Sequence, residues 1–272
     1  MTSESEQTRA AIVRSLELLW RGRGPRTRGP KPGLSLEGIV TAAVALADRE
    51  GVEALSMRKV AAELGVGTMS LYRYVPGKTE LLHLMIDQVA APPEPVPGEA
   101  DQDWRTRLER VGRATYQRLQ DHPWLLQLNL ARTLLGPKAL LDFDHSLSVL
   151  DGLDLTGREK VSMIVALDSY VTGIARHYVL LRQAAEESGL SDEEFWELQG
   201  PSIEKIFTQD DFPHVMRLDE DVFSATPDEI TDFGLARVLD GMEAFITARQ
   251  AARREGRWQP PPAAEPDGEC LT

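Results

Sequence analysis

Three cationic side chains stand at helix starts where helix electrostatics disfavour them. Arg58 and Lys59 follow a serine that can cap a helix, and Lys78 follows a Pro-Gly pair at the expected start of another helix. Because the positive end of the helix dipole favours acidic side chains, cations at these places lower helix stability. Free backbone N–H groups beside a cation can instead bind a phosphate. The sequence therefore indicates a phosphate-binding surface, with solvated surface cations as the alternative for each residue taken singly.

These cations belong to a segment with the pattern of two short helices joined by a tight turn. Ser56 is a suitable N-cap for a helix over Met57–Leu64, and Gly65 can end that helix in the left-handed conformation. The following helix should bury Leu71 and Val75. This is the helix-turn-helix pattern, in which the second helix enters the major groove of DNA.

The same segment resembles the DNA-binding domain of the tetracycline-repressor (TetR) family of transcription regulators. Ala-Ala-Glu-Leu-Gly-Val is followed after three residues by Ser-Leu-Tyr-Arg-Tyr-Val and then by Lys78, with the family's spacing of glycine, tyrosine and lysine. The similarity extends over about residues 36–89. Tyr74 has two interpretations, burial inside the motif or contact with a phosphate. The motif and the resemblance together imply these DNA-binding residues: Arg58, Lys59, Thr68, Met69, Ser70, Tyr72, Arg73, Tyr74 and Lys78.

The net charge of −13 is unevenly distributed along the 272 residues. Residues 1–90 contain 12 Lys and Arg against 10 Asp and Glu, whereas the remainder contains 18 against 33. The acidic excess should keep the surface of the C-terminal part away from DNA. Cys270 is the only cysteine, so no intrachain disulfide can form. No membrane partner is expected, because no apolar run is long enough to span a bilayer, and a cytoplasmic protein is expected.

The sequence predicts an all-α fold with an N-terminal three-helix helix-turn-helix DNA-binding domain and a larger helical ligand-binding and dimerisation domain. Gly and Pro in the basic segment before Gly33 favour either a flexible arm along DNA or a simple linker. A Pro-rich spacer after residue 90 is semi-rigid. The expected division is an N-terminal helix with a basic arm (1–33), the DNA-binding domain (34–90), the effector-binding and dimerisation domain (99–252) and a disordered tail (253–272).

The C-terminal part has helical periodicity throughout and no useful strand pattern. Val161–Leu181 is apolar on most sides and should be a central, mostly buried helix. Gly234, Gly241 and Ala248 recur every seven residues beside an apolar stripe on the last helix. The resemblance implies that two long helices form a homodimer there, and packing within one subunit is the alternative. The predicted helices of this part are 102–120, 123–135, 137–151, 157–187, 191–208 and 228–252.

No catalytic or metal-binding constellation accompanies these helices. The five histidines form no His-Glu-x-x-His pair, and Gly77-Lys78 lacks the upstream glycine of a phosphate loop. We therefore expect no enzyme activity, no metal and no cofactor. The family resemblance implies instead a largely apolar pocket for a small-molecule effector of unknown identity. The candidate pocket residues among the aromatic and histidine side chains are Trp124, Phe143, His145, Tyr170 and His177.

Together these observations favour a TetR-like transcription regulator, and we expect it to be a repressor. It should bind a palindromic double-stranded operator as a homodimer and be released by a small-molecule effector. Two alternatives from other classes remain at this point. One is a helical enzyme fused to a DNA-binding module, and the other is an architectural protein without a ligand.

Overall fold

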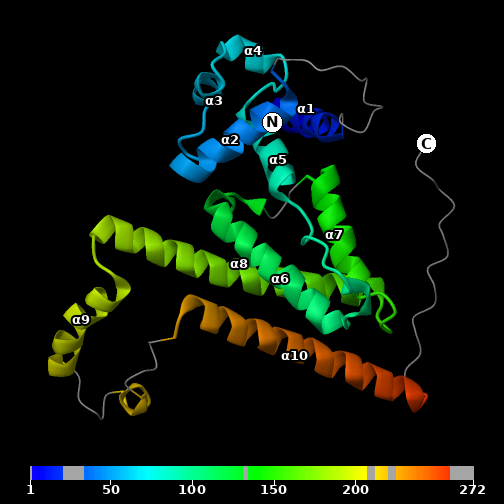
Figure 1. The fold of residues 1–272 in the computed structure, drawn as a ribbon, viewed down its shortest axis with the longest axis vertical. Coiled ribbons are helices and arrows are strands. Elements are labelled where there is room, and N and C mark those ends of the chain that lie inside the picture. Colours follow the sequence, from blue (N-terminus) through cyan, green and yellow to red (C-terminus); the bar gives the residue numbers. More distant parts are fainter. Residues whose placement is uncertain (1, 21–33, 131–133, 207–211, 220–224, 258–272) are drawn as a thin grey trace.

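The computed structural model describes residues 2–20, 34–130, 134–206, 212–219 and 225–257, and all regular structure in these ranges is helical (Figure 1). A smaller N-terminal unit, α1–α5, sits on a larger unit formed by α6–α10. The all-α prediction is confirmed. The predicted basic arm over residues 21–33 and the part of the predicted tail beyond residue 257 lie outside the described residues.

Capping side chains set the helix boundaries of the N-terminal unit where the sequence predicts them. The Oγ of Ser35 accepts a hydrogen bond from the N–H of Gly38 at 3.0 Å, and the Oγ of Ser56 accepts one from the N–H of Lys59 at 3.3 Å. Gly65 ends the first helix of the motif at φ +66°. The helices are α1 (Thr2–Trp20), α2 (Leu36–Glu50), α3 (Met57–Glu63), α4 (Thr68–Tyr72) and α5 (Lys78–Val89).

A compact core holds α3 and α4 in the helix-turn-helix arrangement. Leu71 and Val75 are 0 % exposed, as predicted, and they lie beside Val60 and Ala61 of α3. The small side chain of Ala61 is compatible with a close crossing of the two helices. The five-residue α4 is too short to be stable alone, so this core determines its orientation.

Helix α1 forms where an N-terminal helix is predicted, and it packs against α5. Leu18 and Leu19 are buried, the Oγ of Ser15 lies 2.9 Å from the Nδ1 of His83, and Arg14 forms an ion pair with Glu80. The indole N–H of Trp20 donates to the carbonyl oxygen of Leu135 in the larger unit at 3.2 Å. Helix α1 therefore contacts both units.

The described residues of the larger unit contain five α-helices and three short 3-10 helices, η2 (Glu99–Asp101), η3 (Pro123–Gln127) and η5 (Val215–Arg217). The prediction of one helix over 123–135 is wrong, because the 3-10 helix η3 ends at Gln127 and the chain is extended at Leu128. Three consecutive residues of η3 are buried, Trp124, Leu125 and Leu126, and one face of an α-helix cannot bury three neighbours. The α-helices are α6 (Trp104–Asp121), α7 (Pro137–Val149), α8 (Gly157–Ser188), α9 (Asp192–Ile206) and α10 (Pro227–Arg254).

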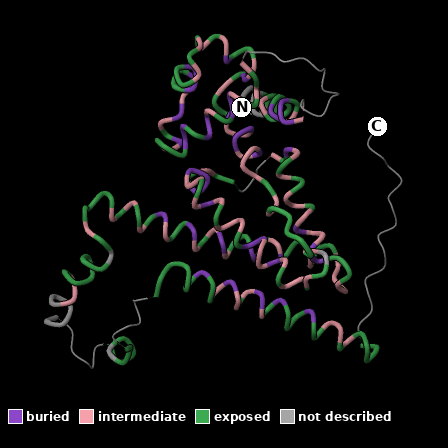
Figure 2. Tube along the Cα trace, viewed as in Figure 1, coloured by how far each residue is buried: buried purple, intermediate pink, exposed green. Residues whose placement is uncertain are grey.

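Helices α6, α8 and α10 pack against one another and form the body of this unit. Buried residues recur along one side of α8 and of α10 (Figure 2). The prediction that Val161–Leu181 is mostly buried is wrong for the single chain, because Val165 and Leu180 are 55 % and 56 % exposed. Helix α8 therefore has a second face whose apolar side chains the described residues do not cover.

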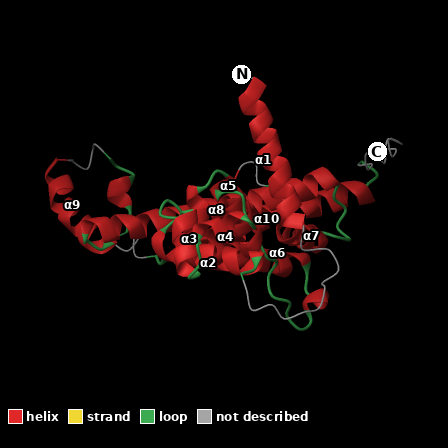
Figure 3. Cartoon of the chain, turned by 90° about the horizontal axis from the view of Figure 1, so that it is seen from above, coloured by secondary structure: helices red, strands yellow, loops and turns green. Residues whose placement is uncertain are grey.

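Ion pairs join α10 to its neighbours. Arg113 of α6 forms an ion pair with Asp232 at 2.6 Å, and Arg249 pairs with Glu159 of α8. Seen from above, α9 and the N-terminal end of α1 extend away from the body (Figure 3). The body therefore presents a broad lateral surface made of α8 and α10.

Candidate functional site

The exposed side of α4 carries the side chains predicted to read DNA. Met69 is 76 % exposed and Tyr72 is 44 % exposed, while Leu71 on the opposite side is fully buried. Thr68 and Ser70 are partly exposed in the first turn of the helix. The short helix thus points its N-terminal turn outward while its inner side is anchored in the core.

The cations of the motif differ in their partners. Arg58 and Arg73 are exposed, and no hydrogen bond or ion pair joins either one to another described residue. The Nζ of Lys59 instead donates to Glu50 at 2.8 Å, and this bond is the main reason that the pKa of Glu50 lies below its ordinary value. The Nζ of Lys78 donates to the carbonyl oxygen of Val52 at 3.2 Å. Arg58 and Arg73 are therefore the cations with uncommitted guanidinium groups.

Tyr74 lies just after α4, and its ring is half-buried. It packs against the apolar core of the N-terminal unit, and its N–H donates to the carbonyl oxygen of Leu71 at 2.8 Å. Of the two interpretations that the sequence allows for this residue, the structure shows packing inside the motif.

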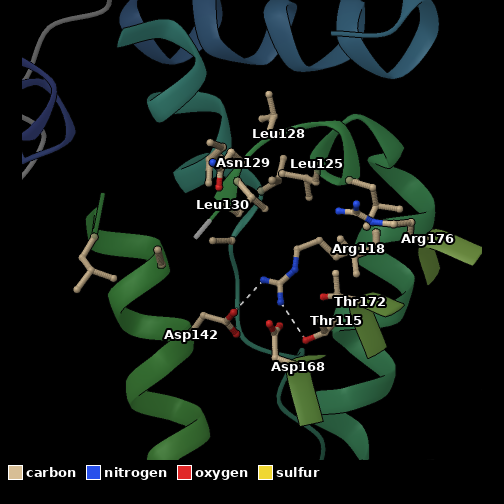
Figure 4. A pocket seen from close by; sticks show the side chains of 17 residues that line it. Thr115, Arg118, Leu125, Leu128, Asn129, Leu130, Asp142, Asp168, Thr172 and Arg176 are labelled. Atoms are coloured by element: carbon tan, nitrogen blue, oxygen red, sulfur yellow. Dashed lines mark hydrogen bonds and ion pairs between the residues drawn. The ribbon is translucent and has the colours of Figure 1, made fainter. Parts of the chain in front are cut away.

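A cavity of about 760 Å³ lies directly beneath the C-terminal end of α5 (Figure 4). Its apolar wall includes Ile86 and Val89 of α5, Leu119 of α6, and Leu125 and Leu128 of the η3 segment. Its polar side comes from α6, α7 and α8. A mainly apolar cavity with a few polar groups is the usual form of a small-molecule site.

The polar side of this cavity centres on Arg118. Its guanidinium donates to the carboxylate of Asp142 at 2.9 Å and to the hydroxyl of Thr115 at 3.1 Å. The carboxylate of Asp168 points into the same space (Figure 4), but no hydrogen bond or ion pair joins it to another described residue. Burial raises the pKa of Asp168 and the charge of Asp142 adds to this effect, whereas the charge of Arg118 opposes it. Water still reaches the side chain through the open cavity.

The same polar residues also line a second chamber of about 420 Å³ between α6, α7 and α8. Arg118, Asp142 and Asp168 border both chambers, so they stand at the junction between them. Phe143 and Ile164 line the second chamber. The two chambers thus share their charged lining residues.

The five side chains predicted for the effector pocket do not gather in one place. Phe143 lines the second chamber, and His177 lines a separate cavity of about 850 Å³ between α6, α8, α9 and α10. Trp124, His145 and Tyr170 line none of these three cavities. The hydroxyl of Tyr170 donates to the carbonyl oxygen of Thr231 at 3.0 Å and so ties α8 to α10.

Sequence reasoning did not select the charged residues of the cavity. Arg118 and Asp142 come from helices whose contact cannot be read from sequence spacing. Asp168 did carry a local signal, because it interrupts the apolar residues of α8. An ionisable group in an otherwise apolar helix is a departure from the local pattern that often marks a functional position.

Two aspartates of the N-terminal unit bind the larger unit. The Oδ1 of Asp87 in α5 accepts hydrogen bonds from the N–H groups of Lys138 and Ala139 at 3.1 and 2.9 Å, and thereby caps the N-terminus of α7. A Cβ at Gly136 would collide with this carboxylate.

The second link joins α2 to η3. The Oδ1 of Asp48 accepts the indole N–H of Trp124 at 2.6 Å and lies 2.8 Å from the Nδ1 of His122. Trp124 is 1 % exposed, so it is a structural residue at the boundary of the two units. Both links connect the DNA-facing unit to elements that border the cavity.

The described residues contain neither a metal-binding cluster nor a membrane-spanning helix. No group of three or more His, Cys, Asp or Glu side chains in these ranges is arranged to hold a metal ion. Among the helices that the structure describes, none is long and apolar enough to cross a membrane.

Both units match models of one protein family. Residues 39–85 match the tetR family of bacterial regulatory proteins, and residues 96–246 match the tetracycline repressor-like C-terminal domain. The similarity that the sequence shows around the helix-turn-helix therefore extends over both units. The alternative of a helical enzyme fused to a DNA-binding module is not supported.

Individual proteins agree with these matches. The chain is 48 % identical over 240 residues to the HTH-type transcriptional repressor DrrR1 of Streptomyces coeruleorubidus, a similarity that covers 88 % of each chain. Among solved structures, the Streptomyces coelicolor TetR family protein ActR in complex with actinorhodin is similar with a TM-score of 0.62 and 27 % identity, covering 79 % of this chain and 99 % of that one. The regulator SCO7222 of the same organism has a TM-score of 0.60 and 26 % identity, covering 78 % and 99 %.

Proposed function

Because the chain belongs to the TetR family of bacterial transcriptional repressors, we propose that it binds a near-palindromic operator as a homodimer and leaves it when a small molecule occupies the cavity beneath α5. TetR-family repressors bind operator DNA and small-molecule effectors. For this chain we propose which surfaces bind DNA and the effector, that two copies form a dimer, and how the effector site acts on the DNA-binding site.

The DNA-binding part of the proposal uses the exposed side of α4. Met69 and Ser70 lie in its outward turn, where they can reach base edges, and Tyr72 lies beside them. Arg58 and Arg73 flank the helix with free guanidinium groups that suit phosphates. The phosphate contacts would position the helix, and the side chains of α4 would supply the sequence preference.

One observation carries the link between the two sites. Helix α5 begins at Lys78 beside the DNA-binding motif and ends at Ile86 and Val89 in the cavity wall. Its 12 residues span about 18 Å at the α-helical rise. A molecule in the cavity therefore contacts the same rigid element that supports the DNA-facing motif, and displacement of α5 would move that motif.

The cavity supports a drug-sized effector. Its volume of about 760 Å³ lies within the range of small-molecule sites, and the related ActR structure contains actinorhodin. The effector needs only to favour the arrangement that does not bind DNA by a few kcal/mol. The contacts of Asp87 and Asp48 give each arrangement a specific set of hydrogen bonds at the boundary of the units.

The dimer part of the proposal uses the open faces of α8 and α10. Val165 and Phe233 are 55 % and 66 % exposed, and Cβ atoms at Gly173 and Gly241 would meet no atom within 4 Å. An apolar face with small residues allows two helices to approach closely. Gly234 instead serves packing within one subunit, because it leaves room for the ring of Tyr170 of the same chain. Two recognition helices related by the dimer axis would then enter grooves about 34–36 Å apart.

The test is selection of bound duplexes from random DNA with the purified full chain, followed by footprinting of the selected site. We expect an inverted repeat whose half-sites are one or two helical turns apart. Screening small molecules for release of this operator, by fluorescence anisotropy, then tests the effector. Selection of a single half-site without a repeat would contradict the dimeric mode, and absence of any selected sequence would contradict operator binding.

A further inference from the structure

The charges inside the cavity do not cancel at its centre. Arg118 is engaged by Asp142 and Thr115, so the negative charge of Asp168 has no bonded partner among the described residues. The only other cation that lines this cavity in the described part of the chain is Arg176. It lies two turns further along α8, about 12 Å away by helix rise. The centre of the cavity therefore has an excess of one negative charge.

Asp168 is placed to meet a ligand and does not pack against the chain. The residue is exposed, and its carboxylate opens onto the cavity, so water solvates it when no ligand is bound. The neighbouring buried positions on α8, Leu167 and Val171, are apolar. A cationic group that enters the cavity can therefore reach this carboxylate without displacing a hydrogen-bond partner among the described residues.

We propose that Asp168 anchors the protonated amine of an amphipathic effector, whose apolar body lies against the wall formed by α5 and η3. This inference rests on the proposed function, since it concerns the same effector cavity. The apolar wall and the carboxylate lie on opposite sides of one space (Figure 4), as such a molecule requires. With the amine in place, the two carboxylates and the two cations at the centre balance, and the Arg118–Asp142 pair stays intact.

Other classes of ligand fit these charges less well. An anionic ligand would have to compete with Asp142 for Arg118 and would face the charge of Asp168. A neutral apolar ligand would fill the same volume but would leave the carboxylate without a partner. The proposal is therefore tested by whether the cavity binds a cation more tightly than a neutral molecule of the same shape.

The experiment compares 9-aminoacridine, which is protonated at neutral pH, with acridine, which has the same ring system and is neutral there. Binding to the purified full chain is measured by isothermal titration calorimetry without DNA, because acridines also bind DNA. We expect the wild type to bind 9-aminoacridine at least about tenfold more tightly than acridine, since a tenfold ratio corresponds to a modest charge-assisted contact. The variant Asp168→Asn should lose this preference while it still binds acridine.

The matched control is Asp144→Asn, which removes an exposed carboxylate of α7 that lines none of the three cavities. This control should keep the wild-type preference, and circular dichroism melting of each variant checks that it is folded. Equal affinity for the two acridines, no binding of either, or an unchanged preference in Asp168→Asn would each overturn the anchor. Operator selection with the wild type is independent of these outcomes, so the anchor can fail while the proposed repressor function stands.

Discussion

The side chains around α4 differ in the kind of DNA contact they can make. Met69 offers only apolar contact, for instance to a thymine methyl group, and the hydroxyl of Ser70 can bond either a base edge or a phosphate. Neither side chain can form the bidentate hydrogen bonds that an arginine makes with guanine. Arg58 is a free cation at the start of α3, where it can bind a phosphate of any sequence.

Substitution of Met69 by Ala should therefore alter which base pairs are preferred, at about 1–3 kcal/mol for a good contact. Arg58→Ala should weaken binding to all sites nearly equally and reduce the salt dependence by about 0.9 in the log–log slope. Arg58 is a cleaner test than Lys78, because the amine of Lys78 also bonds the carbonyl oxygen of Val52. Binding selections and salt titrations measure both effects. Altered base preference in Arg58→Ala alone would show that the placement of α4 in the groove is wrong.

Asp168 should also affect stability in a pH-dependent way. Because burial raises its pKa in the folded chain, folding disfavours the ionised form, and this penalty grows as the pH rises through the raised value. Asp168→Asn removes the penalty, so the variant should melt above the wild type at neutral pH. The difference should vanish at pH values below about 3.9, where Asp is protonated in the unfolded chain as well. Thermal melts without ligand across this range test it, and a lower melting temperature at neutral pH would reveal a favourable partner of the carboxylate.

Helix boundaries could be predicted where local chemistry determines them. Ser35 and Ser56 cap the helices that follow them, and Gly65 ends α3 as expected. The segment after Pro123 could not be predicted in this way, because long-range contacts bury three consecutive side chains and Trp124 bonds Asp48 of α2. Tertiary packing overrides helical periodicity there.

The residues of the candidate sites also fall into two groups, those that the sequence could select and those that it could not. The residues proposed to face DNA could be selected from the sequence because they lie close together in one motif of known spacing. The cavity residues could not, since Arg118, Asp142 and Asp168 meet only after α6, α7 and α8 have packed. Aromatic residues proved a poor guide, because the chain uses Trp124 and Tyr170 for contacts between helices.

The contact of α5 with α7 leads to a prediction at the scale of these helices. Asp87→Ala removes the cap from α7 and should destabilise the protein by about 0.5–2 kcal/mol, measured by urea denaturation. It should also reduce the ability of an effector to release the operator, because the cap joins the DNA-facing unit to the cavity wall. Asp144→Ala on the exposed side of α7 is the control. Unchanged release in a measurably destabilised Asp87→Ala protein would restrict Asp87 to a structural role.

For the whole molecule, the open faces of α8 and α10 are the surfaces through which we propose that two copies meet. In the single chain these faces expose Val165, Leu180, Phe233 and Phe245, at 42 % or more of each residue. Exposed apolar groups that gather on one surface mark interaction sites. Dimerisation through them would place the two DNA-binding units on the same side of the assembly.

Gly241 and Gly234 separate dimer contacts from packing within the chain. Gly241→Leu should weaken dimerisation without lowering the melting temperature of the monomer, because no described atom lies within 4 Å of its Cβ position and leucine is the better helix former. Gly234→Leu should instead lower stability, since the new side chain would collide with Tyr170. Analytical ultracentrifugation and thermal melts distinguish the two effects. A Gly241→Leu dimer of wild-type strength would place the interface elsewhere, and a wild-type monomer at micromolar concentration would exclude it.

The bond between Trp124 and Asp48 has a spectroscopic consequence. An indole that is 1 % exposed emits fluorescence at shorter wavelength than one in water, and its N–H bond crosses the boundary between the two units. Separation of α2 from η3 would admit water to this ring and shift its emission to the red. In a variant whose other four tryptophans are replaced by Phe, Trp124 would thus report in real time, without a label, on the junction of the DNA-facing and ligand-binding parts.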